Sequence, residues 1–185
     1  MGGSYLDLSK QSVMIVDDNR HMRAILCSIF RALSIKDLKE VGDGETALLE
    51  VKSFEPTLVV TDWHMEPMDG IALVKSIRHS ASSSVKYVPI IILTGHSDLQ
   101  RVQEARDSGV NEFMAKPVAA KDILKRLETI IAHPRSFIEN DAYFGPDRRR
   151  RDQGPPNGTK ERRDGASSAP DASNEAFSPE QAMAN

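Results

Sequence analysis

The chain has 185 residues, of which 39% are hydrophobic and 28% are charged, and its formal net charge is -3. This length predicts one good-sized domain with a further segment, and the charge argues against a nucleic-acid or membrane partner for the molecule as a whole. The one cysteine, Cys27, excludes an intramolecular disulfide and fits a reducing compartment. No apolar run approaches the roughly 18 residues of a membrane span, and the first residues lack a signal-peptide pattern. We therefore expect a cytoplasmic protein.

Short apolar runs alternate with amphipathic stretches from residue 12 to residue 133. Apolar runs bounded by polar residues predict buried strands at residues 12–16, 37–41, 57–61, 88–93 and 110–115. Apolar residues at helical spacing predict helices at residues 20–33, 44–54, 97–106 and 121–132, and one more that Asp69 caps. Gly109 is expected to terminate the helix before it, and the serine-rich residues 79–84 predict a loop.

Five strand-helix pairs in succession predict a parallel sheet with helices on both faces, because each crossover is right-handed and lays its helix on the sheet. The fold class is therefore α/β, with a doubly wound five-stranded sheet. We assign this domain to residues 12–133 and treat residues 1–11 as an N-terminal extension.

Polar side chains follow four of the predicted strands. Asp17 and Asp18 follow the first, Asp62 the third, Thr94 the fourth and Lys116 the fifth. The carboxyl ends of parallel strands converge on one crevice, where ligands bind in such sheets. Clustered carboxylates suit Mg²⁺, and a carboxylate can attack phosphorus and form an acyl phosphate. The pattern predicts a magnesium-dependent aspartate that accepts a phosphoryl group.

In their order and spacing, these motifs resemble the receiver domain of bacterial two-component response regulators. The resemblance covers residues 12–132 and includes Met68-Asp69-Gly70 after the third strand and Lys116-Pro117 after the fifth. It implies the flavodoxin-like receiver fold, with Asp62 as the phosphorylated residue. It also implies that Mg²⁺ is held by the side chains of Asp17, Asp18 and Asp62 and by the backbone carbonyl of His64.

The resemblance also gives roles to the residues around the acceptor. Lys116 would pair with the phosphoryl oxygens, and Pro117 would be a cis-proline that aims this lysine. Thr94 would donate its hydroxyl to the phosphoryl group, and Phe113 matches the aromatic residue that turns inward as Thr94 moves. His64 and His96 lie two residues beyond Asp62 and Thr94, where receivers tune the lifetime of the acyl phosphate.

The two histidines have a second interpretation, and the residue after Asp62 offers a probe of the site. His64 and His96 could instead form a transition-metal site together with Asp62. Trp63 is the one tryptophan, and we expect it to pack at the rim of the site, where it would report on the site by fluorescence.

The predicted function is that of a stand-alone, non-enzymatic phosphorelay protein. It would take a phosphoryl group from a sensor histidine kinase or a phosphotransfer protein, and bind an output partner through the face of helix 97–106, strand 110–115 and the last helix. One alternative is a haloacid-dehalogenase-type phosphatase, but such enzymes need an aspartate where His64 stands. Another is an unphosphorylated scaffold that acts through its tail.

Residues 134–185 differ in composition from the domain. Glycine and proline recur and apolar residues become sparse, which predicts a largely disordered tail. Two pairs of large side chains, Phe137-Ile138 and Tyr143-Phe144, could dock on the domain or on a partner. Residues 148–163 contain a basic segment, read either as a solvated charge run or as a contact for a protein partner; the aspartates near it make nucleic acid the weaker choice.

Overall fold

The computed structural model describes residues 7–95, 99–140 and 143–147, which belong to the first of two units of the chain, Met1–Arg148. Its main feature is a five-stranded parallel sheet in the order β2-β1-β3-β4-β5. The strands are β1 (Ser12–Val16), β2 (Asp37–Val41), β3 (Leu58–Asp62), β4 (Ile90–Thr94) and β5 (Glu112–Ala115). The predicted doubly wound α/β fold is confirmed.

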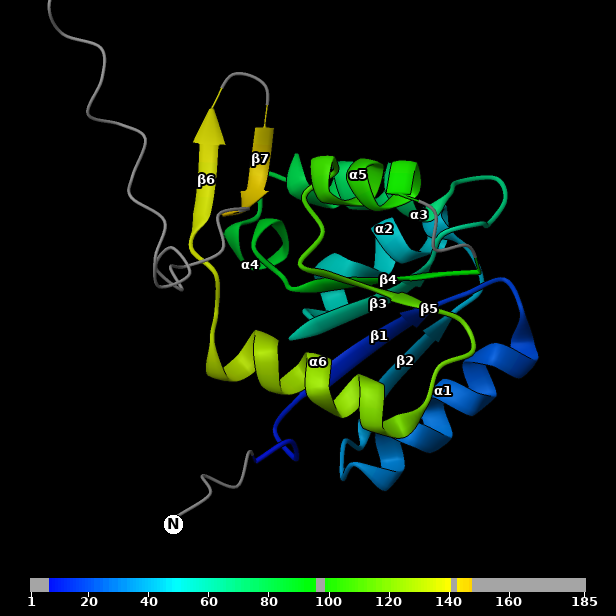
Figure 1. The fold of residues 1–185 in the computed structure, drawn as a ribbon. Coiled ribbons are helices and arrows are strands. Elements are labelled where there is room, and N and C mark those ends of the chain that lie inside the picture. Colours follow the sequence, from blue (N-terminus) through cyan, green and yellow to red (C-terminus); the bar gives the residue numbers. More distant parts are fainter. Residues whose placement is uncertain (1–6, 96–98, 141–142, 148–185) are drawn as a thin grey trace, which may run out of the picture. The chain divides into compact units, whose positions relative to one another are not determined.

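Helices cover both faces of this sheet (Figure 1). They are α1 (Arg20–Ala32), α2 (Gly44–Phe54), α3 (Gly70–Arg78), the short α4 (Ser83–Lys86), α5 (Leu99–Asp107) and α6 (Ala120–Ala132). Buried residues of α1 and α6 share one hydrophobic cluster with the sheet, and buried residues of α2, α3 and α5 share the other. Within the described part of the chain, no helix is both long enough and apolar enough to span a bilayer.

The strands are buried because both faces of the sheet are covered. Every residue of β3 and β4 is buried, which explains their almost uninterrupted apolar runs. In β1 the side chains alternate: Val13 and Ile15 pack toward α1 and α6, whereas Met14 and Val16 pack toward α2 and α3.

Local caps start the helices directly after strand ends and keep the connecting loops short. The Asn19 side chain accepts hydrogen bonds from the first turn of α1, and Asp69 accepts one from the backbone nitrogen of Ala72, at 2.7 Å. Gly109 follows α5 with a φ of 93°, a left-handed conformation that favours glycine. Both the Asp69 cap and the Gly109 terminator were predicted. Residues 79–84 are not wholly a loop, because Ser83 begins α4.

An ordered hairpin follows α6, beyond the boundary at residue 133 that the sequence predicted for the domain. Strands β6 (Phe137–Asn140) and β7 (Tyr143–Pro146) form an antiparallel hairpin, so the first part of the predicted disordered tail is ordered. A hydrogen bond joins the two ends of the hairpin, because the Asp147 nitrogen donates to the Ser136 carbonyl at 2.7 Å. The basic segment at 148–163 lies outside the described residues.

An aromatic cluster fastens the hairpin to the domain. The Tyr87 ring, between α4 and β4, meets those of Phe137 and Phe144 edge to face, with centroids 5.0 and 5.4 Å away. Cations complete the cluster: Lys86 Nζ lies 3.8 Å from the centre of the Phe144 ring, and the Arg78 guanidinium carbon lies 5.1 Å from that of Phe137. The contacts among these rings offset the conformational entropy that the segment loses when it becomes ordered. The composition of the segment alone had predicted disorder.

Arg78, the last residue of α3, is 1% exposed and forms the floor beneath the hairpin. Its Nε donates to the Gly109 carbonyl at 2.9 Å, and its Nη1 donates to the carbonyls of Lys86 and Val88 at 2.9 and 2.8 Å. Its Nη2 donates to Asn111 Oδ1 at 3.0 Å. Burial lowers the pKa of Arg78 to about 9, so the guanidinium still carries its charge at neutral pH.

Replacing Phe137 with Ala is expected to lower the free energy of unfolding by about 2 kcal/mol, because the ring is half-buried against Tyr87 and Arg78. Urea denaturation measures the change, and hydrogen exchange at the Asp147 amide should accelerate. Glu139→Ala is the control on the same hairpin. It removes an exposed ion pair with Lys86 and should change stability by less than about 1 kcal/mol.

Candidate phosphoacceptor site

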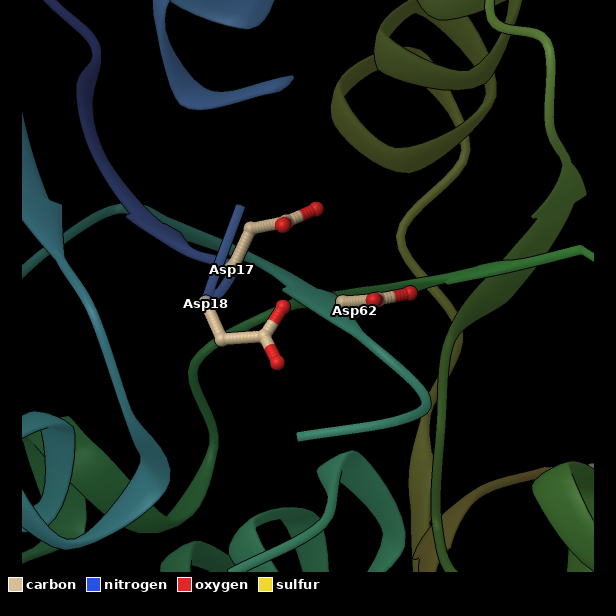
Figure 2. A group of neighbouring side chains, drawn as sticks. All are labelled: Asp17, Asp18 and Asp62. Atoms are coloured by element: carbon tan, nitrogen blue, oxygen red, sulfur yellow. The ribbon is translucent and has the colours of Figure 1, made fainter. Parts of the chain in front are cut away.

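Three carboxyl groups meet at the carboxyl edge of the sheet. Asp17 and Asp18 follow β1, and Asp62 is the last residue of β3 (Figure 2). Oxygen atoms of these three side chains all lie within 4.8 Å of one another. Asp17 is fully buried and Asp62 is 8% exposed, whereas Asp18 is exposed to solvent. The predicted convergence of the strand ends therefore brings all three predicted carboxylates together.

Lys116, directly after β5, bridges two of these carboxylates. Its Nζ lies 2.9 Å from Asp17 Oδ2 and 3.0 Å from Asp62 Oδ1. Its backbone nitrogen donates to the carbonyl of Thr94 at 2.7 Å, which fixes the lysine to the end of β4. The Lys116-Pro117 peptide is cis, as the resemblance implied.

The backbone around Asp62 is held by close contacts. Asp62 Oδ1 accepts from the backbone nitrogen of Trp63 at 2.8 Å, and the Trp63 carbonyl accepts from the Gly70 nitrogen at 2.9 Å. A Cβ atom on Gly70 would lie 2.1 Å from the Asp62 carbonyl oxygen, so only glycine allows the start of α3 to approach this closely. This role of Gly70 was not predicted; the signal in the sequence is its place in the Met-Asp-Gly motif.

The charges at the site do not balance. Burial raises the pKa of Asp62 above its ordinary value of 3.8, as does the nearby Asp17 carboxylate, and Lys116 offsets only part of this rise. For Lys116 burial lowers the pKa, but its hydrogen bonds to Asp17 and Asp62 outweigh burial and leave the pKa above 10.5. At neutral pH one ammonium group thus faces three carboxyl groups.

This imbalance fits a divalent cation. Mg²⁺ prefers hard oxygen ligands and keeps several of its waters, so it suits two or three carboxylates at a partly open edge. The exposed position of Asp18 leaves such an opening, while Asp17 and Asp62 are buried. The donor set consists of oxygen atoms alone, as the chemistry of Mg²⁺ requires.

Asp62→Asn is expected to raise the free energy of unfolding of the metal-free protein at neutral pH. Because the folded-state pKa of Asp62 is raised, the ionised carboxylate is disfavoured in the fold. That penalty is absent below the unfolded-state pKa of 3.8 and grows as pH rises through the folded-state pKa. Urea denaturation in EDTA across a pH series should show a gain at pH 7 that disappears in acid. A variant less stable than wild type at pH 7 would contradict this account.

The other predicted residues are found in different settings. Thr94 is buried at the end of β4, and Phe113 is half-buried on the neighbouring β5. The His64 side chain is exposed and is not a member of the carboxylate group, so the described residues do not support a transition-metal site there. His96 lies outside the described residues. Trp63 is 5% exposed and packs in the core beneath the site, which corrects its predicted place at the rim.

The sequence matches the family model of the response regulator receiver domain over residues 13–128, more than half of the chain. The chain therefore belongs to this family, whose members are signalling proteins of two-component systems. The match ends before the hairpin begins, so β6 and β7 are additions to the shared domain.

Chemotaxis receivers are among its relatives. CheY-3 of Vibrio cholerae is 36% identical over 118 residues, which cover 64% of this chain and 89% of the relative. CheY of Pseudomonas aeruginosa is 34% identical over 118 residues, which cover 64% of this chain and 94% of the relative.

Solved structures agree with the fold. CheY4 of Vibrio cholerae superposes with a TM-score of 0.60 at 25% identity, over 65% of this chain and 98% of that one. CheY of Borrelia burgdorferi, solved in a complex with CheX, BeF3 and magnesium, gives a TM-score of 0.60 at 25% identity, over 65% of this chain and 89% of that one.

Proposed function

We propose that Asp62 accepts a phosphoryl group from the phosphohistidine of a sensor histidine kinase or a phosphotransfer protein, and that this modification changes partner binding. The main support is the contact of a single lysine, Lys116, with both Asp62 and Asp17 at the strand ends of a receiver-family chain. Such a lysine, next to a carboxylate, offers positive charge where a phosphoryl group would be attached.

In the proposed reaction, a carboxylate oxygen of Asp62 attacks phosphorus, an O–P bond forms and the N–P bond of phosphohistidine breaks. The electron pair of that bond remains on the imidazole nitrogen, which takes up a proton. Mg²⁺, held by Asp17, Asp18, Asp62 and the His64 carbonyl, would neutralise charge on the transferring group. Lys116 would then exchange its contact with Asp62 for one with a phosphoryl oxygen.

The response to phosphorylation would start at Thr94. Its hydroxyl group would donate to the phosphoryl group from the end of β4, and Phe113 on the adjacent strand would turn inward. We assign the output face to α5, β5 and α6, where these changes would alter affinity for a protein partner. The Borrelia burgdorferi CheY in complex with CheX illustrates a receiver bound to a protein partner.

The chain would act as a signalling module in the cytoplasm and not as an enzyme. Residue 64 is histidine, whereas a haloacid-dehalogenase-type phosphatase needs an aspartate at this position. His64 and His96 would instead tune the lifetime of the acyl phosphate. Neither nucleic acid nor a membrane is a proposed partner.

Beryllofluoride, a mimic of the aspartyl phosphate, tests the site through Trp63 fluorescence. The backbone nitrogen of Trp63 donates to Asp62 Oδ1, and the Trp63 side chain is buried beside the acceptor residue, so its fluorescence should respond first to Mg²⁺ and again to beryllofluoride. Asp62→Asn is expected to lose the second step, since the amide cannot bind beryllium as a carboxylate does. If wild type is folded by circular dichroism but shows no change with either addition, the acceptor site is not functional.

A further inference from the structure

Arg23 on α1 contacts the backbone of both acidic residues that follow β1. Its Nη1 donates to the Asp17 carbonyl at 2.7 Å and to the Asp18 carbonyl at 3.3 Å. The Arg23 side chain is 19% exposed; its bond to the Asp17 carbonyl is partly buried, whereas its bond to the Asp18 carbonyl is exposed. A charged donor makes stronger hydrogen bonds than a neutral one, so the contacts restrain this turn of the chain.

The guanidinium is confined on its other side by β2. Its Nε lies 3.7 Å from Glu40 Oε2, which is within ion-pair range but too long for a hydrogen bond. This Nε is buried, and among the described residues it has no hydrogen-bond partner. The arginine thus leaves one donor unsatisfied while its Nη1 meets two carbonyls, so its placement favours the β1-α1 turn over the carboxylate of Glu40.

Two further hydrogen bonds hold the turn between β1 and α1, in addition to those from Arg23. The Asp17 nitrogen donates to the Val41 carbonyl at 3.2 Å, and Asp17 Oδ1 accepts from the Asn19 nitrogen at 2.8 Å. Asp18 lies between these anchors with an exposed side chain. Among the described residues, the bond from Arg23 to the Asp18 carbonyl therefore restrains the backbone that carries the Asp18 carboxylate.

We propose that Arg23 is a positioning residue for the cation site: it holds the carbonyls of Asp17 and Asp18 so that both carboxylates point toward one ion. The inference rests on the proposed function, because that function supplies the cation. Groups that orient metal ligands without touching the metal typically change metal affinity by about 10- to 100-fold when they are removed.

The test is calorimetric titration of the full chain with Mg²⁺, for wild type and Arg23→Met. We expect the dissociation constant for Mg²⁺ to rise about 10-fold in the variant, with an unchanged number of sites and an unchanged Trp63 fluorescence at saturation. Arg31→Met is the matched control: it makes the same substitution at an exposed position on the same helix and should leave the affinity unaltered.

Arg23→Lys covers the case in which Arg23→Met does not fold. The lysine nitrogen falls one bond short of Nη1, so Mg²⁺ binding should also weaken, by a smaller factor. The inference is overturned if a folded variant at position 23 binds Mg²⁺ as wild type does, even with reduced stability, or if Arg31→Met weakens binding equally. If wild type itself binds no Mg²⁺, the proposed function fails instead.

Discussion

Asp62→Asn should reduce phosphoryl incorporation from phosphoramidate to the level of a reaction without protein. The amide of asparagine is not a nucleophile under these conditions. The neighbouring carboxylates of Asp17 and Asp18 are not expected to accept the phosphoryl group instead of Asp62. Asp17 is fully buried and is already paired with Lys116 at 2.9 Å, and Asp18 is not bridged by this lysine. The loss should therefore be complete, with no transfer to a neighbouring carboxylate.

Intact-mass spectrometry after incubation with phosphoramidate and Mg²⁺ measures this loss. Wild type should gain the mass of one phosphoryl group, and EDTA should prevent the gain. Asp37→Asn is the matched control, because Asp37 is exposed at the opposite end of its strand and the chemical change is identical. Phosphoryl incorporation in the Asp62→Asn protein at the wild-type rate would exclude Asp62 as the acceptor.

Arg78→Met should lower the free energy of unfolding by about 3 kcal/mol. Two effects oppose each other at this site. Removing a buried charge relieves desolvation, which is the cause of the lowered pKa of Arg78. Against this, three backbone carbonyl groups lose the donor that Arg78 supplies, and each buried unsatisfied acceptor costs about 1–3 kcal/mol. Asn111 Oδ1 also loses its bond to Arg78 but keeps the one from the Ile90 nitrogen. The three carbonyl losses outweigh the relief.

Urea denaturation and thermal melting measure the effect, and a loss of this size should lower the melting temperature by roughly 10 °C. Arg106→Met serves as the control, because Arg106 is exposed on α5 and should change stability by less than about 0.5 kcal/mol. Equal stabilities for Arg78→Met and wild type would show that the desolvation of the guanidinium cancels its hydrogen bonds.

The sheet and the site were predictable because they depend on local patterns. Buried strands need apolar runs, and parallel strands bring their carboxyl ends together, so Asp17, Asp62 and Lys116 could be placed from their positions alone. Strand ends were less certain: Asp62 itself belongs to β3, which was expected to stop one residue earlier.

What could not be predicted depends on contacts between distant parts of the chain. Arg78 ends a helix, where a cation usually faces water and complements the helix dipole, and nothing local signals its burial. The hairpin is ordered by Tyr87, which lies some fifty residues away from Phe137. The contacts of Arg23 could not be predicted either, because its partners are backbone carbonyls, which every residue has and which leave no signal in the sequence.

The hairpin also determines where a shortened fragment of this protein should end. A fragment ending at residue 128, where the family match ends, would lack both strands and part of α6. It would uncover the ring of Tyr87, which is 44% exposed even with the hairpin in place, together with the apolar surface that Phe137 and Phe144 cover. Uncovered aromatic surface promotes self-association. Fragments for expression should therefore extend through residue 147, so that solubility is not lost for reasons unrelated to signalling.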